Sequence, residues 1–94
     1  PNNKKKLNII RVKLDKLDNK LLSLIKNRTS LVKEVLKLKE FKKEIVDQKR
    51  INFILNKIKG KSKKLKIDPK ITNRIWKNMI WSYIDYERRN FKKK

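Results

Sequence analysis

The chain contains neither glycine nor proline between Asn2 and Lys59, and a stretch this long without helix breakers permits a very long helix. Within it, apolar residues recur with alternating spacings of four and three, which is the heptad pattern of a single helical seam. The pattern predicts one helix over residues 7–39. Its seam consists of Ile10, Leu14, Leu17, Leu21, Leu24, Leu31, Val35 and Leu38.

The length of this helix predicts a dimer. Thirty-three helical residues span about 50 Å, whereas a compact globule of 94 residues is about 32 Å across. The chain cannot cover such a seam by itself, so a second protomer is its natural cover. We expect an intertwined helical homodimer.

Two shorter helices are predicted after the charged segment 40–44. Asp47 can cap the second helix, whose apolar stripe is Ile51, Ile54, Leu55 and Ile58, and Gly60 is expected to end it. Four lysines within residues 61–66 indicate a solvated loop. We expect an all-α fold with a three-helix protomer, forming one domain over residues 1–94.

The third helix has the clearest start signal, because Asp68 can cap it and Pro69 suits its first position. Its inward stripe is predicted to contain Ile71, Ile75, Trp76, Met79, Ile80, Tyr83 and Ile84. Trp76 is interpreted as core, and Trp81 points away from the stripe, toward a partner or solvent.

The composition excludes several classes of enzyme and site. The chain has no His and no Cys, which rules out histidine-dependent nucleophilic triads, His or Cys metal sites and disulfides. We expect neither a metal nor a cofactor. No apolar run approaches the 18 to 20 or so residues of a membrane span, and no signal-type segment follows the first six residues. These features predict a cytoplasmic protein without a membrane partner.

A formal net charge of +21 is compatible with binding of a phosphate backbone. The charge comes from 24 Lys but only 6 Arg, beside 12 Ile and 10 Asn, a bias toward residues with A/T-rich codons. Much of the positive charge can therefore result from this codon bias on solvent-exposed faces. Proteins that recognise base edges also favour Arg over Lys.

A few polar residues stand where the helical pattern asks for apolar ones. Arg28 lies on the seam. Three interpretations are open: it forms an interior ion pair, its side chain bends outward to solvent, or it binds an anion. Lys39 shares its helix face about 16 Å away, while Arg11 lies about 25 Å from Arg28 and could reach it only from a second, antiparallel protomer. Arg50 adds a cation behind Asp47.

Glu87 follows Tyr83 by four residues, so both face inward on the third helix. Converging cations with one carboxyl, and no conventional base or nucleophile, suit a small dianion whose reaction needs no proton transfer. A unimolecular rearrangement catalysed by orientation and charge stabilisation fits this description.

The polar and apolar positions together resemble the all-helical (AroQ-class) chorismate mutases. The resemblance runs through the first helix from Ile10-Arg11 past Arg28 to Lys39, through Asp47-x-x-Arg50, and through residues 76–87. It implies a three-helix protomer, an intertwined dimer with two equivalent active sites, and conversion of chorismate to prephenate in aromatic amino-acid biosynthesis.

The resemblance also implies roles for single residues. Arg28 would hold one substrate carboxylate and Arg11, from the other protomer, the second. Lys39 would donate to the ether oxygen whose bond breaks. Glu87 would contact the same oxygen, and as a glutamate it must carry a proton to donate. Asp47 would lie beside the substrate hydroxyl, and Arg50 would support the cationic wall.

Two positions depart from the usual mutase pattern. Ile51 replaces the glutamate that commonly follows the Arg50-type arginine, and Tyr83 replaces a serine. Both resemble the isochorismate pyruvate-lyase branch, which forms salicylate and pyruvate. Chorismate mutase is the first hypothesis and isochorismate pyruvate lyase the second. A basic nucleic-acid-binding module is the non-enzyme alternative, but Trp76 and Tyr83 lie on an apolar stripe rather than among exposed cations, which argues against it.

Overall fold

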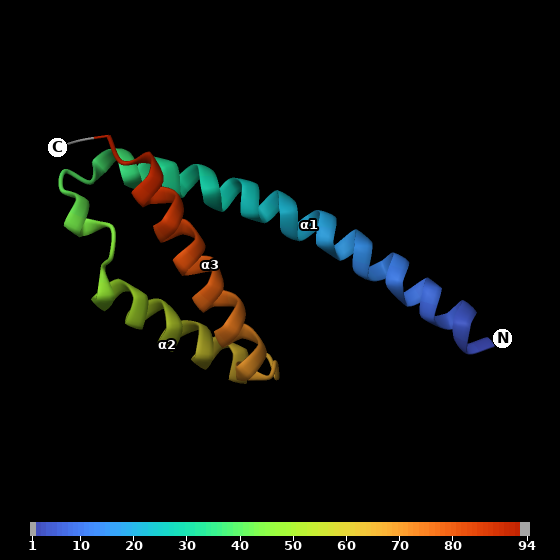
Figure 1. Ribbon diagram of the computed structural model, residues 1–94. Coiled ribbons are helices and arrows are strands. Elements are labelled where there is room, and N and C mark those ends of the chain that lie inside the picture. The colour runs from blue at the N-terminus through green and yellow to red at the C-terminus, as the bar shows by residue number, and fades with distance from the viewer. Residues whose placement is uncertain (1, 93–94) are drawn as a thin grey trace. The chain divides into compact units, whose positions relative to one another are not determined.

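A computed structural model describes residues 2–92. The elements are helix α1 (Asn2–Leu38), a short 3₁₀ helix η1 (Lys42–Glu44), helix α2 (Gln48–Lys64) and helix α3 (Pro69–Asn90), which Figure 1 shows in chain order. No strand occurs among the described residues, so the predicted all-α class is confirmed. None of the helices within 2–92 combines the length and apolar character that crossing a bilayer requires.

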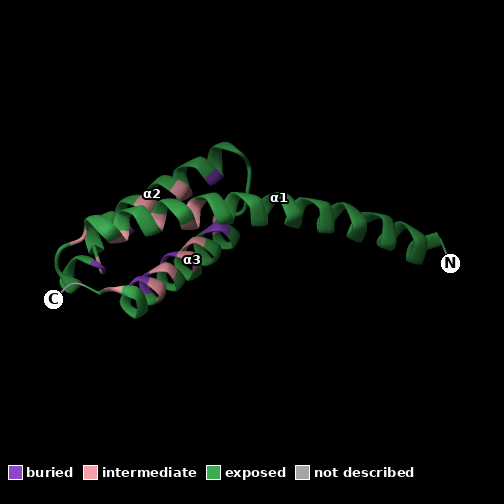
Figure 2. Cartoon of the chain, turned by 90° about the horizontal axis from the view of Figure 1, so that it is seen from above, coloured by how far each residue is buried: buried purple, intermediate pink, exposed green. Residues whose placement is uncertain are grey.

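The chain divides into two units, Pro1–Val32 and Lys33–Lys94. The first is helical from Asn2 onward, five residues earlier than predicted, because residues 2–6 contain no helix breaker. Every residue from Asn2 to Asn27 is exposed, as Figure 2 shows for this part of α1. The exposed residues include Leu14, Leu17, Leu21 and Leu24 of the heptad seam.

The apolar seam of α1 is exposed along the first unit. Such a face is stable in water only when another surface covers it. This observation is what the dimer prediction requires, although the dimer itself stays a prediction.

The second unit has a small core made of isoleucine. Its buried members are Ile45, just after η1, Ile51 on α2, and Ile80 and Ile84 on α3. Val46, Ile54, Leu55 and Phe91 pack against them. Burial of one such side chain contributes about 1.5–3 kcal/mol, so this cluster holds α2 and α3 together.

The end of α2 corrects the predicted helix boundary. The helix passes through Gly60 and ends at Lys64, so the expected loop over residues 61–66 is wrong for its first four residues. The backbone N–H groups of Lys66 and Ile67 donate to the carbonyls of Lys63 (3.1 Å) and Ser62 (2.9 Å). This is the Schellman pattern of helix termination, and Lys66 adopts the left-handed conformation it needs, with φ 58°.

The start of α3 is as predicted: the Asp68 side chain accepts from the Lys70 N–H, and Pro69 occupies the first turn. The predicted inward stripe is wrong for Ile71 and Ile75, which are both more than half exposed. The reason is that Thr72 takes the buried position there, with its Oγ1 2.7 Å from Oγ of Ser62 on α2. Further along, Trp76, Met79 and Tyr83 are half-buried.

Candidate active site

A buried ion pair joins the two ends of the second unit. Nζ of Lys39 lies 2.8 Å from Oε1 of Glu87, and the two side chains are 17% and 7% exposed. Lys39 immediately follows α1, where its N–H donates to the Leu36 carbonyl, and Glu87 lies near the end of α3. These residues are 48 positions apart, so their contact is a product of the tertiary fold.

The ion pair adjoins the isoleucine core. Glu87 lies one turn after Ile84 and four residues after Tyr83, so the three side chains share a face of α3. Electrostatic interactions and hydrogen bonds are stronger in such poorly hydrated surroundings than in water. The arrangement can therefore present a cation and a carboxyl to a polar atom of a small ligand while an apolar surface supports the rest of it.

Asp47 and Arg50 have local roles at the start of α2. Oδ1 of Asp47 accepts from the backbone N–H of Arg50 at 3.1 Å, which caps the helix as predicted. The Arg50 guanidinium lies over the ring of Phe53, 5.4 Å from its centroid. Both Asp47 and Arg50 are exposed, and the contacts predicted for them with a substrate stay predictions.

Ile51 is only 6% exposed and belongs to the isoleucine core. Packing against Ile45, Ile80 and Ile84 is by itself a sufficient reason for an apolar residue here. The apolar side chain is therefore not specific to one reaction, and its use as an argument for the lyase branch is weakened.

The two predicted carboxylate-binding arginines belong to the first unit. Arg11 is exposed and Arg28 is half-buried, both on α1. Their predicted convergence with Lys39 and Glu87 stays a prediction.

The sequence did not reveal a groove near the end of α3. Its volume is about 300 Å³, and the surface that lines it is mostly apolar but also includes lysines. The lining residues are Lys33, Leu36, Lys37, Tyr86, Asn90, Phe91 and Lys92. Leu36 and Phe91 belong to none of the predicted apolar stripes, so no sequence pattern marks the groove. Within residues 2–92, no cluster of three or more acidic, His or Cys residues could hold a metal ion.

Comparison with known proteins gives a family for this geometry. Residues 10–88 match the family described as chorismate mutase type II. The chain is 37% identical over 76 residues to the chorismate mutase of Methanocaldococcus jannaschii, which covers 80% of this chain and 77% of that protein. No solved structure matches the chain significantly. The matched segment includes Arg11, Arg28, Lys39, Asp47, Arg50 and Glu87, and the chain belongs to the chorismate mutase type II family.

Proposed function

We propose that this chain is a chorismate mutase, an isomerase that converts chorismate to prephenate in the biosynthesis of aromatic amino acids. The observation that carries the proposal is the buried contact between Lys39 and Glu87. The family resemblance assigns these two side chains to the same ether oxygen of the substrate. Two groups that serve one atom must lie side by side, and these do so at 2.8 Å.

The rearrangement is pericyclic: the ether C–O bond breaks while a new C–C bond forms, and no proton is lost or gained. Negative charge grows on the ether oxygen in the transition state. The Lys39 ammonium donates to that oxygen and stabilises the charge. Glu87 donates from its other side only when it is protonated, because an ionised carboxylate has no hydrogen to donate.

The remaining roles concern binding. Arg28 and the partner protomer's Arg11 each hold one substrate carboxylate through bidentate hydrogen bonds. Asp47 lies beside the substrate hydroxyl, Arg50 adds to the positive potential, and Ile51 and Tyr83 form part of the wall. Fixing both carboxylates selects the reactive conformer of the substrate.

The working molecule is a homodimer in this proposal. The uncovered heptad seam on residues 10–31 supports it, as does the distance of about 25 Å along the helix between Arg11 and Arg28, which prevents one chain from bringing both to one site. We place the enzyme in the cytoplasm, with a small dianion as its ligand and no cofactor or metal.

An assay with two substrates tests the proposal. Purified protein is incubated separately with chorismate and with isochorismate, and prephenate, salicylate and pyruvate are each measured. We expect prephenate from chorismate. Lys39→Ala should lower kcat by about 10²–10³ because one preorganised donor is lost. Lys42→Ala removes a nearby exposed lysine of η1 and should leave kcat near the parent value. Salicylate and pyruvate without prephenate would replace the mutase by the lyase.

A further inference from the structure

Helix α2 carries an unusual distribution of charge. From Gln48 to Lys64 it contains Lys49, Arg50, Lys57, Lys59, Lys61, Lys63 and Lys64, and no carboxylate. The chain has no acidic residue between Asp47 and Asp68. All the cations of α2 are exposed, so this surface repels other cations and has no internal partner of opposite charge.

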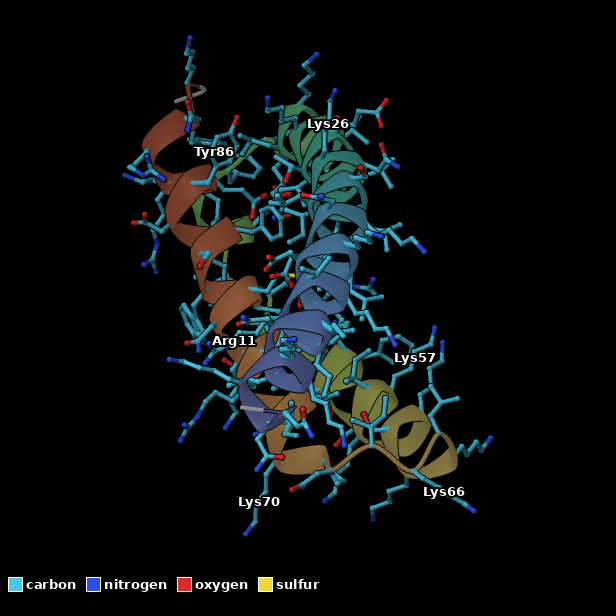
Figure 3. All side chains as sticks on the ribbon, turned by 90° about the vertical axis from the view of Figure 1, so that its right-hand side faces the viewer. Arg11, Lys26, Lys57, Lys66, Lys70 and Tyr86 are labelled. Atoms are coloured by element: carbon cyan, nitrogen blue, oxygen red, sulfur yellow. The ribbon has the colours of Figure 1, made fainter. Side chains whose placement is uncertain are left out.

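The cations are ordered along one face with an aromatic ring among them. At 100° per residue, Arg50, Phe53, Lys57, Lys61 and Lys64 fall within a sector of about 80°. We call these five residues the α2 basic stripe. It lies off the buried side of the helix, which Ile51 and Ser62 define. Figure 3 shows Lys57 extending away from the ribbon, with Lys66 doing the same just after the helix.

Phe53 is the aromatic member of the stripe. The residue is 54% exposed, similar to many other large apolar residues of the chain. The Arg50 guanidinium lies 5.4 Å from its ring centroid. Nζ of Lys57 lies 5.7 Å from the ring centroid. Proteins that bind single-stranded nucleic acids combine exposed aromatic rings with cations, because a base stacks on the ring while the cations contact phosphates.

Carboxylates are sparse throughout the chain, and the longest interval between two of them contains α2. The other long intervals, residues 19–33 and 69–84, hold 15 and 16 residues without an acidic side chain. The chain has nine acidic residues, and they lie before and after α2: Asp15, Asp18, Glu34, Glu40, Glu44, Asp47, Asp68, Asp85 and Glu87. The absence of any carboxylate from the twenty residues between Asp47 and Asp68 leaves the positive potential of α2 unopposed.

We infer that the α2 basic stripe binds single-stranded nucleic acid, with lysines on the phosphates and one base stacked on Phe53. The Arg50 guanidinium lies over the Phe53 ring, and contacts with phosphates and stacked rings do not read base edges, so the binding is independent of sequence. Substrate chemistry at Lys39 and Glu87 does not enter the argument. The inference therefore stands or falls separately from the mutase activity.

Binding to fluorescent oligo-dT and oligo-U of about 12 nucleotides tests the inference by titration across a range of salt concentrations. The parent chain should bind both with micromolar affinity at low salt, and log K should fall linearly with log salt. The triple variant Lys57→Gln/Lys61→Gln/Lys64→Gln should lower the salt slope by about 2, which corresponds to three lost phosphate contacts. A matched triple, Lys4→Gln/Lys5→Gln/Lys6→Gln, changes the net charge equally and should keep most of the parent slope.

Phe53→Leu isolates the stacking contribution. It should weaken binding of both single strands about tenfold or more and leave binding of a duplex of equal length unchanged. A preference for oligo-dT or oligo-U identifies DNA or RNA as the better ligand and supports the inference in either case. Circular dichroism checks the fold of every variant.

Three results would overturn the inference. Equal losses in the two lysine triples would mean that net charge alone drives the binding. An unchanged affinity of Phe53→Leu for single strands would exclude the stacked base. Equal or tighter binding to polyglutamate, or to vesicles of phosphatidylcholine and phosphatidylserine, would assign the stripe to an acidic protein or a lipid surface.

Discussion

At the residue scale, the Lys39–Glu87 pair has both a structural and a chemical consequence. Both side chains are largely buried, and a buried charge is costly unless it has a partner. Here the Lys39 Nζ lies 2.8 Å from the Glu87 carboxyl. In our proposal, a substrate that inserts its ether oxygen between them must replace that interaction with contacts of its own.

The first prediction concerns the hydrogen bond that Glu87 would donate to the ether oxygen. Glu87→Gln keeps the size of the side chain and donates through its amide, so this variant should retain activity. Glu87→Ala should lower kcat/KM by about 10², because one preorganised donor is lost. The measurement is kcat/KM of the parent and both variants at one fixed pH. Equal losses in the two variants would mean that the site does not use a hydrogen bond donated from this position.

Tyr83 and Ile51 show how a residue can be interpreted in two ways from the sequence. Both stand at positions where the family resemblance expects polar side chains. The structure places Ile51 within the core and leaves Tyr83 half-buried, one turn from Glu87. Core packing constrains Ile51 directly, whereas Tyr83 remains the better candidate for a contact that distinguishes two substrates.

At the element scale, α2 has one internal position that weakens it. Gly60 lies inside the helix, and a Cβ added there would meet no atom within 4 Å. Glycine in a helix interior costs about 0.5–1 kcal/mol relative to alanine, mainly through the entropy of the unfolded chain.

The second prediction follows directly. Gly60→Ala should raise the free energy of unfolding by about 0.5–1 kcal/mol without affecting activity. The measurement is denaturant unfolding at one fixed protein concentration, because the stability of a dimer depends on concentration. A loss of stability would mean that the position contacts a neighbouring surface that the described chain does not contain.

The third prediction concerns the turn after α2. Lys66 has φ 58°, a conformation that costs a residue with a Cβ about 1 kcal/mol. Lys66→Gly should therefore stabilise the fold by up to about 1 kcal/mol, since glycine is the usual residue at this point of a Schellman turn. Lys64→Gly, still inside the helix, should destabilise it by a similar amount. Thermal unfolding of the two variants compares the same Lys→Gly change at a left-handed position and at a helical position.

At the scale of the whole molecule, the main feature is the exposed apolar seam of α1. A contiguous row of exposed leucines on this scale is typical of a surface that binds another surface. In our proposal the cover is a second copy of the chain, which also brings Arg11 to a site that contains Arg28.

The fourth prediction uses this exchange of residues. Arg11→Ala and Arg28→Ala should each be nearly inactive. Unfolding and refolding them together in equal amounts should restore about a quarter of the parent activity, because half of the dimers are mixed and each mixed dimer has one intact site. Sedimentation and mass spectrometry establish that mixed dimers form. Mixed dimers without activity would contradict a shared site.

The sequence by itself determined the all-α class, the long first helix and the caps at Asp47 and Asp68. These follow from local rules, since helix periodicity and capping depend on residues a few positions apart. The tertiary structure alone decided that α2 continues through Gly60, that Thr72 rather than Ile71 faces the interior, and that Ile51 packs in the core. Each of these depends on a neighbour distant in sequence or on a whole pattern of hydrogen bonds, and local propensity does not contain that information.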